Sequence, residues 1–503
     1  MSGAAILRAH AADGVATALR PLAAGEVLAG GATVQTAIAA GHKVAVQAMA
    51  AGQPVIKLGQ MIGVARCAIA PGDHVHVHNL AFAGGAGAAQ AASRITEVAP
   101  RSASFSGIVR ADGRVATRNF IGILTSVNCS ATVARRVADH FTPDRLAAFP
   151  AIDGVAAFTH SSGCGMAKAG QGIDNLRRTI AGYARHPNFA AVLIIGLGCE
   201  VNQIAALVDR EGLTVDGQTI RTLDIQQAGG TRAAIDAGIA AVSALLPAAN
   251  AVQREPVSAA HLTVGLQCGA SDGYSALTAN PALGRAADLV VAAGGRVILS
   301  ETPEVFGAEN LLIERARNAA VADALRQRLA WWQDYAAGHG ADLDNNPSPG
   351  NIAGGITTIL EKSLGAVAKS GTSPLNAVVD YAAPVTAPGF SFMDTPGYDP
   401  CSATGQIAGG ANLIAFTTGR GSVFGSVPAP TLKLASNSAL AARMADDIDI
   451  DCGRLITGAA TLDMLGEEIF SAMLALASGQ RSRSEELGIG DSEFVPWVPG
   501  AAM

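Results

Sequence analysis

The stretch AVLIIGLGC, residues 191–199, decides the fold class. Its first five residues form an unbroken apolar run of the kind found in strands that are buried on both faces. Glycines and a cysteine end the run, as expected where a strand gives way to a turn. We therefore predict a strand over Ala191–Gly196 in the interior of a parallel sheet.

Similar runs flank this stretch on both sides, and helical patterns lie between them. The other predicted strands are Phe120–Val127, Val155–Thr159 and Leu262–Leu266. The predicted helices are Ala131–His140 and Asn175–Arg185. Strands that alternate with helices indicate mostly parallel sheets covered by helices. A polar, proline-containing stretch near residues 247–258 divides this region, so we expect two α/β domains, over residues 105–254 and 255–503.

The first part of the chain has a different residue pattern, with glycine turns and short alternating apolar stretches. Residues 24–27, 51–55 and 71–75 each combine a glycine turn with alternating apolar residues, which predicts a small β domain over residues 1–82. Residues 83–104 start with glycine and alanine and continue with polar residues, a composition typical of a linker.

Length, charge and apolar content exclude several classes of protein. The 503 residues are too many for one hydrophobic core. The net charge of −6, without a basic cluster interleaved with aromatic residues, argues against a nucleic-acid partner. The apolar run at residues 4–7 is too short for a signal peptide. The most apolar stretch, residues 237–252, contains Ser243, Pro247 and Asn250, so we expect no membrane span.

Cysteine usage and surface composition suggest where the protein acts. Seven cysteines, an odd number without close pairing, argue against a disulfide framework and favour a reducing cytoplasm. Charged residues make up 15% of the chain, fewer than in an average soluble domain. This low share favours a compact enzyme that assembles as a homo-oligomer, for which we expect a dimer.

Four cysteines follow predicted strands, in loops of glycine, serine or asparagine: Cys129, Cys164, Cys199 and Cys268. Ligands bind at this edge of α/β sheets. One such cysteine alone is best interpreted as a small buried hydrophobic residue, but four equivalent positions favour a site. Thiolates suit iron, zinc or an iron–sulfur cluster, although no Cys-x-x-Cys pair is present. Alternatively, Cys164 is a nucleophile with His160 as its base.

Histidines supply a second set of candidates. In the segment DHVHVHN, residues 73–79, alternation along a strand places three histidines on one face: His74, His76 and His78. Such a face either holds a divalent cation, acts as acid and base, or is simply a solvated face of a hairpin. His78, at the strand end, is the preferred functional residue. The pair His42-Lys43 follows a glycine, and is either an acid–base pair or a surface turn.

Three loops have the composition of a site for an acidic polyhydroxy compound, with solvated loop charges as the ordinary alternative. The loop TTGRGS, residues 417–422, offers Thr418 and Arg420 for a carboxylate. The loop DGRVATRN, residues 112–119, offers Arg118 and Asn119. The loop SETPE, residues 300–304, offers two carboxylates for metal binding or proton transfer, of which we select Glu301.

Taken together, these motifs resemble a known family. They are GHKV (41–44), HVHVHN (74–79), DGRVATRN (112–119), NCSATV (128–133), SGCG (162–165), GCE (198–200), QCG with SDG (267–273), NPSPGN with GG (346–355) and FTTGRG (416–421). In this order they resemble the altronate and galactarate dehydratases, also called the altronate hydrolase family, over nearly the whole chain. MDTPGYD (393–399) and FVPW (494–497) are more similar to the altronate branch. Ala116 and Ala270 stand where the family pattern usually has glycine.

The resemblance implies both a fold and an activity. The expected fold is a SAF-type β-clip domain followed by two α/β domains, the last of them Rossmann-like. The expected activity is that of a hydro-lyase that converts D-altronate to 2-dehydro-3-deoxy-D-gluconate. The implied cofactor is a divalent metal, Fe²⁺ or Mn²⁺; an iron–sulfur cluster, which the cysteines themselves leave open, is the alternative. Other functions that fit are dehydration of galactarate or another sugar acid, a sulfolactate sulfo-lyase, or a sugar-acid sensor.

We assign expected roles to the residues as follows. The catalytic candidates are His42, Lys43, His160 and Cys164. The substrate-binding candidates are Arg118, Asn119, Thr418 and Arg420. The metal-ligand candidates are His76, His78, Cys129, Cys199, Cys268 and Glu301. We also expect the N-terminal domain to close over the substrate and to bring its histidines to the cysteine-lined strand ends.

Overall fold

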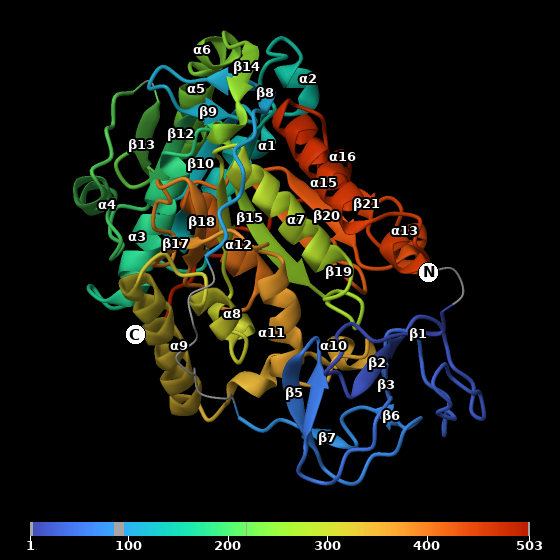
Figure 1. Cartoon of the computed structure of the whole chain (residues 1–503). Helices are drawn as coiled ribbons and strands as arrows, with labels where there is room; N and C mark the ends of the chain where they lie inside the picture. The colour runs from blue at the N-terminus through green and yellow to red at the C-terminus, as the bar shows by residue number, and fades with distance from the viewer. Residues whose placement is uncertain (1–3, 85–94, 218, 501–503) are drawn as a thin grey trace.

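A computed structural model of the chain describes residues 4–84, 95–217 and 219–500. It confirms the predicted class, a small antiparallel β domain followed by α/β regions with a large parallel sheet (Figure 1). Residues 85–94, within the predicted linker, lie outside the described residues. Strand β8 (Ser104–Val109) begins where the predicted linker ends.

Two antiparallel sheets build the N-terminal domain. One has the order β1-β2-β3-β6, with β1 (Ile6–Leu7), β2 (Val15–Ala18), β3 (Lys43–Ala45) and β6 (His74–Val75). The other has the order β4-β5-β7, with β4 (Pro54–Lys57), β5 (Gln60–Ala65) and β7 (Leu80–Ala81).

The three predicted glycine turns of this domain are confirmed. Gly25, Gly52 and Gly72 have φ angles of 82°, 80° and 93°, in the left-handed region that glycine adopts without strain. Strands follow the second and third turns, whereas Val27 after the first forms only an isolated bridge to Thr33.

The middle region contains a four-stranded parallel sheet in the order β11-β10-β12-β13. Its strands are β10 (Phe120–Thr125), β11 (Gly154–Phe158), β12 (Phe189–Gly196) and β13 (Ile220–Asp224). Its helices include α1 (Ala131–Asp139), α2 (Pro143–Leu146), α3 (Gln171–Ala184) and α4 (Ile204–Glu211). The strands and helices predicted in this region are therefore confirmed to within a few residues.

A small antiparallel sheet that the sequence did not predict lies beside this region. It has the order β14-β8-β9, with β9 (Val115–Ala116) and β14 (Arg254–Ser258) on either side of β8. The polar stretch predicted as a boundary therefore forms an edge strand, and it pairs the end of the middle region with its beginning.

Helices α5 (Thr231–Ser243) and α6 (Leu246–Asn250) complete the middle region. Together they are the one helical segment among the described residues that is long and apolar enough, by length and composition, to cross a membrane. However, α5 packs against α1 and the sheet, and Ala234, Gly238 and Val242 on one of its faces are buried. This packing uses the apolar face within the core of the middle region.

The C-terminal region is built on a seven-stranded parallel sheet in the order β17-β18-β16-β15-β19-β20-β21. The strands are β15 (Thr263–Gly269), β16 (Arg296–Leu299), β17 (Leu375–Val379), β18 (Gly389–Met393), β19 (Leu413–Thr418), β20 (Thr431–Ala435) and β21 (Ile450–Asp451). Apart from the edge strand β17, this is the doubly wound Rossmann order, as predicted. The order reverses between β15 and β19, and ligands bind at such a switch point.

Helices connect and cover these strands. The longer ones are α7 (Ala279–Ala292), α9 (Ala319–Gly338), α11 (Ile359–Ala368), α12 (Asp399–Ala408) and α15 (Leu462–Ala477). The shorter ones are α8 (Asn310–Ile313), α10 (Pro349–Ala353), α13 (Ser438–Arg443), α14 (Arg454–Thr457) and α16 (Arg483–Glu486). Single 3₁₀ turns are η1 (Asn128–Ser130), η2 (Ala259–His261), η3 (Thr302–Val305) and η4 (Leu343–Asn345).

Close packing fixes the two α/β regions against each other. Helix α3 lies directly on α12, and a Cβ atom on Gly182 would stand 2.3 Å from the carbonyl oxygen of Ala408. The C-terminal tail then crosses back over both regions, with Phe494 against Tyr183 and Trp497 stacked on Trp332. The α/β body is therefore a firm base for the loops at the strand ends.

Candidate active site between the N-terminal and C-terminal domains

A crevice opens at the switch point of the large sheet. Its walls come from the loops after β15 and β19, with Asp272 and Tyr274 from the first and Gly419 and Arg420 from the second. The N-terminal domain closes one side with residues 19–21 and Ala40. The crevice therefore lies where the topology predicts a ligand, and two domains line it.

Three arginines line the crevice, and they differ in their partners. Arg20 is paired with Glu26 at 2.6 Å, and Arg443 donates a hydrogen bond to the backbone oxygen of Arg420. The guanidinium of Arg420 is exposed and has no hydrogen-bond or ion-pair partner among the described residues. It is therefore available to an acidic ligand. Thr418 is buried instead, and its hydroxyl accepts a hydrogen bond from the backbone of Gly421.

The loop after β15 is held in an unusual conformation. Ala270 has a φ angle of 52°, in the left-handed region, and its oxygen accepts hydrogen bonds from the backbone of Gly419 and Arg420. Asp272 is buried, and it accepts hydrogen bonds from Ser275 and Asn437. Burial raises the pKa of Asp272, while hydrogen bonds from Ser436 and Ser275 oppose the shift. The carboxyl thus fixes the shape of the crevice wall.

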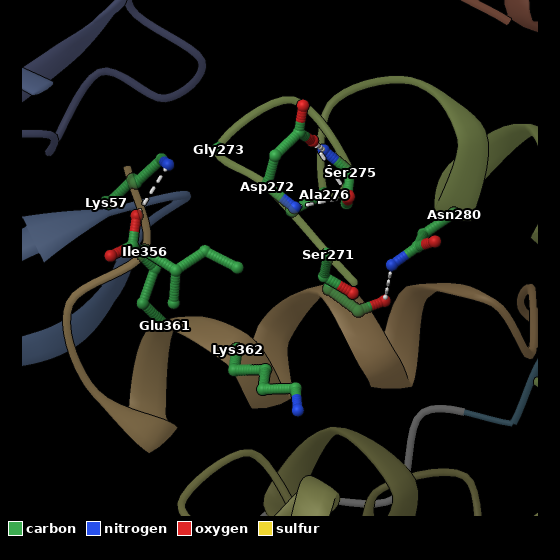
Figure 2. A pocket seen from close by; sticks show the side chains of 11 residues that line it. Lys57, Ser271, Asp272, Gly273, Ser275, Ala276, Asn280, Ile356, Glu361 and Lys362 are labelled. Atoms are coloured by element: carbon green, nitrogen blue, oxygen red, sulfur yellow. Dashed lines mark hydrogen bonds and ion pairs between the residues drawn. The ribbon is translucent and has the colours of Figure 1, made fainter. Parts of the chain in front are cut away.

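A small inner cavity lies behind the crevice and shares Asp272 with it (Figure 2). Figure 2 shows Lys57 of the N-terminal domain reaching across to Glu361 on α11, with Lys362 and Ser271 on the other side of the space. Charged groups from both domains therefore meet around this cavity.

A buried triad of Lys43, Lys57 and Glu361 joins the two domains. The carboxylate of Glu361 lies 2.8 Å from the Lys43 ammonium and 2.7 Å from the Lys57 ammonium. It also accepts hydrogen bonds from the backbone and hydroxyl of Thr357, and Lys43 donates to the carbonyl of Gly355. All three side chains are at most 4% exposed. A buried charge of this kind needs close partners, so the triad fixes how the domains dock.

The triad shifts the titration of its members. Burial lowers the pKa of Lys43 to about 8, although Glu361 opposes this shift. Burial would raise the pKa of Glu361, but the charges of Lys43 and Lys57 outweigh it and hold that pKa below its usual range.

Next to the triad, four histidines form a cluster of rings. His42 Nδ1 lies 3.0 Å from His74 Nε2, and the His76 ring stacks on both of these. His42 and His76 also contact the backbone oxygens of Ala353 and Ile352. The His78 ring is exposed and lies 5.5 Å, between centroids, from the ring of His74.

This cluster differs from the predicted strand face. Strand β6 ends at Val75, because the side chain of Asn79 accepts a hydrogen bond from His76 N and donates one to His74 O, which makes a turn. The structure nevertheless brings these histidines together and adds His42, which is buried and not on a surface turn. Burial lowers the pKa of His42 and of His76, and with the help of its neighbours lowers the pKa of His74 to about 4, so these rings are neutral at pH 7.

Lys362, which lines the inner cavity, links it to a carboxylate–thiol cluster of Cys268, Glu301 and Glu304. One ligand atom from each of the three lies within 4.8 Å of the others. Lys362 contacts Glu304 at 2.8 Å, and Lys369 lies 3.5 Å from Glu301. Glu301 has a φ angle of 69°, in the left-handed region, and its buried Oε1 has no hydrogen-bond partner. Strained backbone of this kind is found at functional sites.

This cluster fits a divalent cation. Burial and the nearby Glu304 raise the pKa of Glu301 well above its usual range and that of Asp399 to about 7, and burial raises the pKa of Cys268 to about 11. Ionised acids in such a place need positive charge. One thiol and two carboxylates are donors that suit Fe²⁺, Mn²⁺ or Zn²⁺, and the unpartnered Glu301 oxygen is available as a ligand.

The remaining predicted residues lie away from the crevice. Arg118 forms an ion pair with Glu485 at 2.6 Å, and Asn119 donates to the backbone oxygens of Ala151 and Ala249. His160 has both ring nitrogens engaged, with Thr125 O at 3.0 Å and Ser162 N at 3.2 Å. Burial lowers the pKa of His160 to about 4.

The four cysteines predicted as one set are divided between two sheets. Cys268 is buried within β15 of the large sheet and does not follow its end. Cys129, Cys164 and Cys199 are exposed and follow three strands of the middle sheet. Among the described residues, no three of these thiols lie within the 4.8 Å that ligands of one ion require.

Several residues of the site were missed by sequence reasoning. They are Lys57, Glu361, Lys362, Lys369 and, although noted beside Glu301, Glu304. A Glu-Lys pair in a helical pattern is usually a solvated face, and only the placement of α11 under the N-terminal domain shows that these charges are buried.

Comparison with known proteins assigns three stretches, which together make up most of the chain, to one family. The altronate/galactarate dehydratase SAF domain matches residues 4–83, the second domain of D-galactarate dehydratase/altronate hydrolase matches residues 107–250, and the C-terminal domain of D-galactarate/altronate dehydratase matches residues 259–502. These ranges correspond to the N-terminal, middle and C-terminal regions of the structure.

The relatives that match nearly the whole chain are altronate and galactarate dehydratases. The altronate dehydratase of Escherichia coli (strain K12) is 38% identical over 95% of this chain and 96% of its own length. The altronate dehydratase of Bacillus subtilis (strain 168) is 33% identical, also over 95% and 96%. The L-threo-forming galactarate dehydratase of E. coli is 35% identical over 96% and 95%.

The triad generates a prediction about stability. Glu361→Gln removes the charge between two buried ammonium groups, and breaking a buried ion pair costs roughly 3–5 kcal/mol. We expect the midpoint of thermal unfolding, followed by circular dichroism, to fall and the N-terminal domain to become sensitive to limited proteolysis. As a control, Asp463→Asn removes the exposed pair with Arg285 and should change stability by less than about 1 kcal/mol. Equal behaviour of the two variants would contradict the role of the triad.

Proposed function

Since the chain belongs to the D-galactarate/altronate dehydratase family, and is thus a hydro-lyase that acts on a sugar acid, we propose that it dehydrates D-altronate to 2-dehydro-3-deoxy-D-gluconate. The observation that carries the choice of substrate is Arg420, the one crevice arginine without a hydrogen-bond or ion-pair partner among the described residues. One unpartnered guanidinium fits the single carboxylate of an aldonate better than the two carboxylates of galactarate.

The chemistry sets what the site must supply. The proton on C2 of an aldonate lies next to a carboxylate, so it is a very weak acid, and its removal gives an enediolate with a high negative charge. The C3–O bond then breaks, and its hydroxyl leaves as water with a proton from the enzyme or solvent. The enol that remains tautomerises to the 2-keto-3-deoxy acid.

We assign the removal of the C2 proton to His42. Its ring is neutral, with Nδ1 on His74 and Nε2 on the backbone oxygen of Ala353, which lines the crevice. A bound substrate takes the place of the Ala353 contact, which frees Nε2 to accept the C2 proton while Nδ1 stays on His74. The contact between His42 Nδ1 and His74 Nε2, continued towards the exposed His78, offers the proton a path to solvent. Lys43, the other candidate base, is fully buried and engaged with Glu361 and Gly355, so its role in the proposal is to hold His42 in place.

Arg420 binds the substrate carboxylate in this proposal, and the buried Thr418 holds its loop in shape. The N-terminal domain excludes water from the reacting end, because residues 19–21 and Ala40 form one wall of the crevice. Loss of bulk water strengthens the interactions of Arg420 and His42 with a charged substrate.

Cys268, Glu301 and Glu304 are the residues that would hold the divalent metal, for which we propose Fe²⁺ or Mn²⁺. When bound, such an ion supplies Lewis acidity that stabilises negative charge on oxygen. Lys362 and Lys369 hold the two carboxylates in position from the protein side. We further propose that the enzyme is cytoplasmic and works as a homodimer.

The central prediction is turnover itself. Protein incubated anaerobically with D-altronate and Fe²⁺ should release a 2-keto-3-deoxy acid, detected by the periodate–thiobarbiturate assay, and should lose this activity on exhaustive chelation and regain it with Fe²⁺ or Mn²⁺. Glu301→Gln should lower both the bound metal, measured by elemental analysis, and the activity, whereas the exposed Glu467→Gln should change neither. Galactarate and sulfolactate are tested in parallel, the latter by sulfite release. Full activity in metal-free protein would refute the metal assignment, and binding of altronate without turnover would indicate a sensor.

A second prediction concerns the binding of the substrate carboxylate by Arg420. Arg420→Met removes a charge-assisted contact, so KM for altronate should rise by roughly 10- to 100-fold, while thermal unfolding stays unchanged. Arg114→Met, which removes an exposed arginine paired only with Asp112, serves as the control and should leave KM unchanged. An unchanged KM in Arg420→Met would show that the substrate carboxylate binds elsewhere.

A third prediction concerns the base. His42→Asn keeps a polar group in the ring's place but removes the proton acceptor, so kcat should fall by roughly 100-fold or more with a smaller change in KM. Exchange of the substrate C2 proton with deuterated solvent, followed by NMR, should be lost with it. The exposed His339→Asn is the matched control. Retention of C2 exchange in His42→Asn would assign the base to another residue.

A further inference from the structure

The middle sheet has a switch point of its own. Its strand order, β11-β10-β12-β13, reverses between β10 and β12, so the connections leave the sheet in opposite directions there. The carboxyl ends of these strands therefore border a second position where α/β sheets bind ligands. The proposed dehydratase site uses the switch point of the large sheet and leaves this one unassigned.

Three loops at this edge are hydrogen-bonded into one unit. Asn128 N donates to Ser162 O, which joins the loops after β10 and β11. Asn202 N donates to Gly163 O, and its side chain donates to Ser126 O, which joins the loop after β12 to both others. A Cβ atom on Gly163 would stand 2.3 Å from Ser126 O, so the loops approach as closely as glycine permits.

Each of these loops carries one exposed cysteine. They are Cys129 after β10, Cys164 after β11 and Cys199 after β12. The amide of Gln226 approaches the sulfur of Cys199 at 3.5 Å, as a donor to that sulfur. Exposed thiols that converge on one edge from three neighbouring strands are unusual for free cysteines, which are mostly buried.

The spacing of these thiols is too wide for a single ion. A tetrahedral zinc with Zn–S bonds of about 2.3 Å needs sulfurs about 4 Å apart. Among the described residues, the one group of three such ligands within 4.8 Å is the carboxylate–thiol cluster of the large sheet. His160, the histidine nearest in sequence to Cys164, has both nitrogens engaged and is not free to complete a mononuclear site.

We propose that Cys129, Cys164 and Cys199 bind a [4Fe–4S] cluster, in which each thiolate ligates one iron and the fourth iron faces the open edge. A sulfide-bridged cluster is larger than a single ion and suits thiols carried by three adjacent loops. The N-terminus of α1, two residues after Cys129, presents backbone amides and the positive end of the helix dipole to this anionic group. The cluster is bound by the middle region, and its binding does not depend on the proposed function.

The test uses the full chain and reads the cluster directly. Protein purified anaerobically and reconstituted with ferrous iron and sulfide should be brown and contain about four acid-labile sulfides per chain, with about four irons beyond any bound at the carboxylate–thiol cluster. Dithionite should give the electron paramagnetic resonance signal of a reduced cluster. Cys129→Ser, Cys164→Ser and Cys199→Ser should each lose most of the iron, sulfide and visible absorption.

Matched controls separate this site from other thiols and from the proposed active site. Cys67→Ser, at an exposed cysteine of the N-terminal domain, and Cys268→Ser should keep the cluster. Circular dichroism confirms that each variant is folded. Absence of acid-labile sulfide in the reconstituted protein, one zinc per chain in its place, or an unchanged cluster in the three cysteine variants would overturn the proposal. None of these outcomes bears on altronate turnover at the large sheet.

Discussion

The arrangement of the site depends on one buried carboxylate. Glu361 of the C-terminal domain lies between Lys43 and Lys57 of the N-terminal domain, with all three shielded from solvent. These three charges satisfy one another in only one relative placement of the two domains, so the triad specifies how the domains dock. Because Lys43 is adjacent to His42, the same contact that joins the domains also positions the histidine beside the crevice. The contact that docks the two domains therefore also brings the residues of the site together.

The neighbouring residue extends this coupling to the other side of the cavity. Glu361 and Lys362 are consecutive on α11, so their side chains leave the helix about 100° apart. One reaches the N-terminal domain and the other reaches Glu304 in the carboxylate–thiol cluster. A single rigid helix thereby sets the distance between the histidine cluster and the cluster that fits a metal. This is the reason to treat the two as parts of one site, although they come from different domains.

Sequence reasoning succeeded where local patterns determine structure. Apolar runs predicted β10, β11, β12 and β15, and glycine turns predicted the β character of the N-terminal domain, because burial on both faces and positive φ angles leave clear local signals. The position of Arg420 in the crevice follows similarly from a loop after an apolar strand, whereas its binding of a carboxylate stays a prediction. By contrast, Lys57 and Glu361 lie 304 residues apart in sequence, and no local sequence pattern predicts their ion pair. Likewise, equivalent positions after strands did not reveal that Cys268 belongs to a different sheet from the other three cysteines.

The four cysteines that follow predicted strands are divided between the two parallel sheets, so each sheet has its own set of donor atoms. Because the four thiols are carried by two separate sheets, they do not line the edge of a single sheet. The large sheet contributes one thiol, Cys268, to a cluster of carboxylates and lysines. The middle sheet gathers three thiols at its own switch point, where the carboxylate of Glu200 accepts hydrogen bonds from Ser126 and Gly198. Each sheet thus presents a different donor set, hard oxygen-rich in one and soft sulfur-rich in the other, and donor softness selects the metal chemistry that each edge supports.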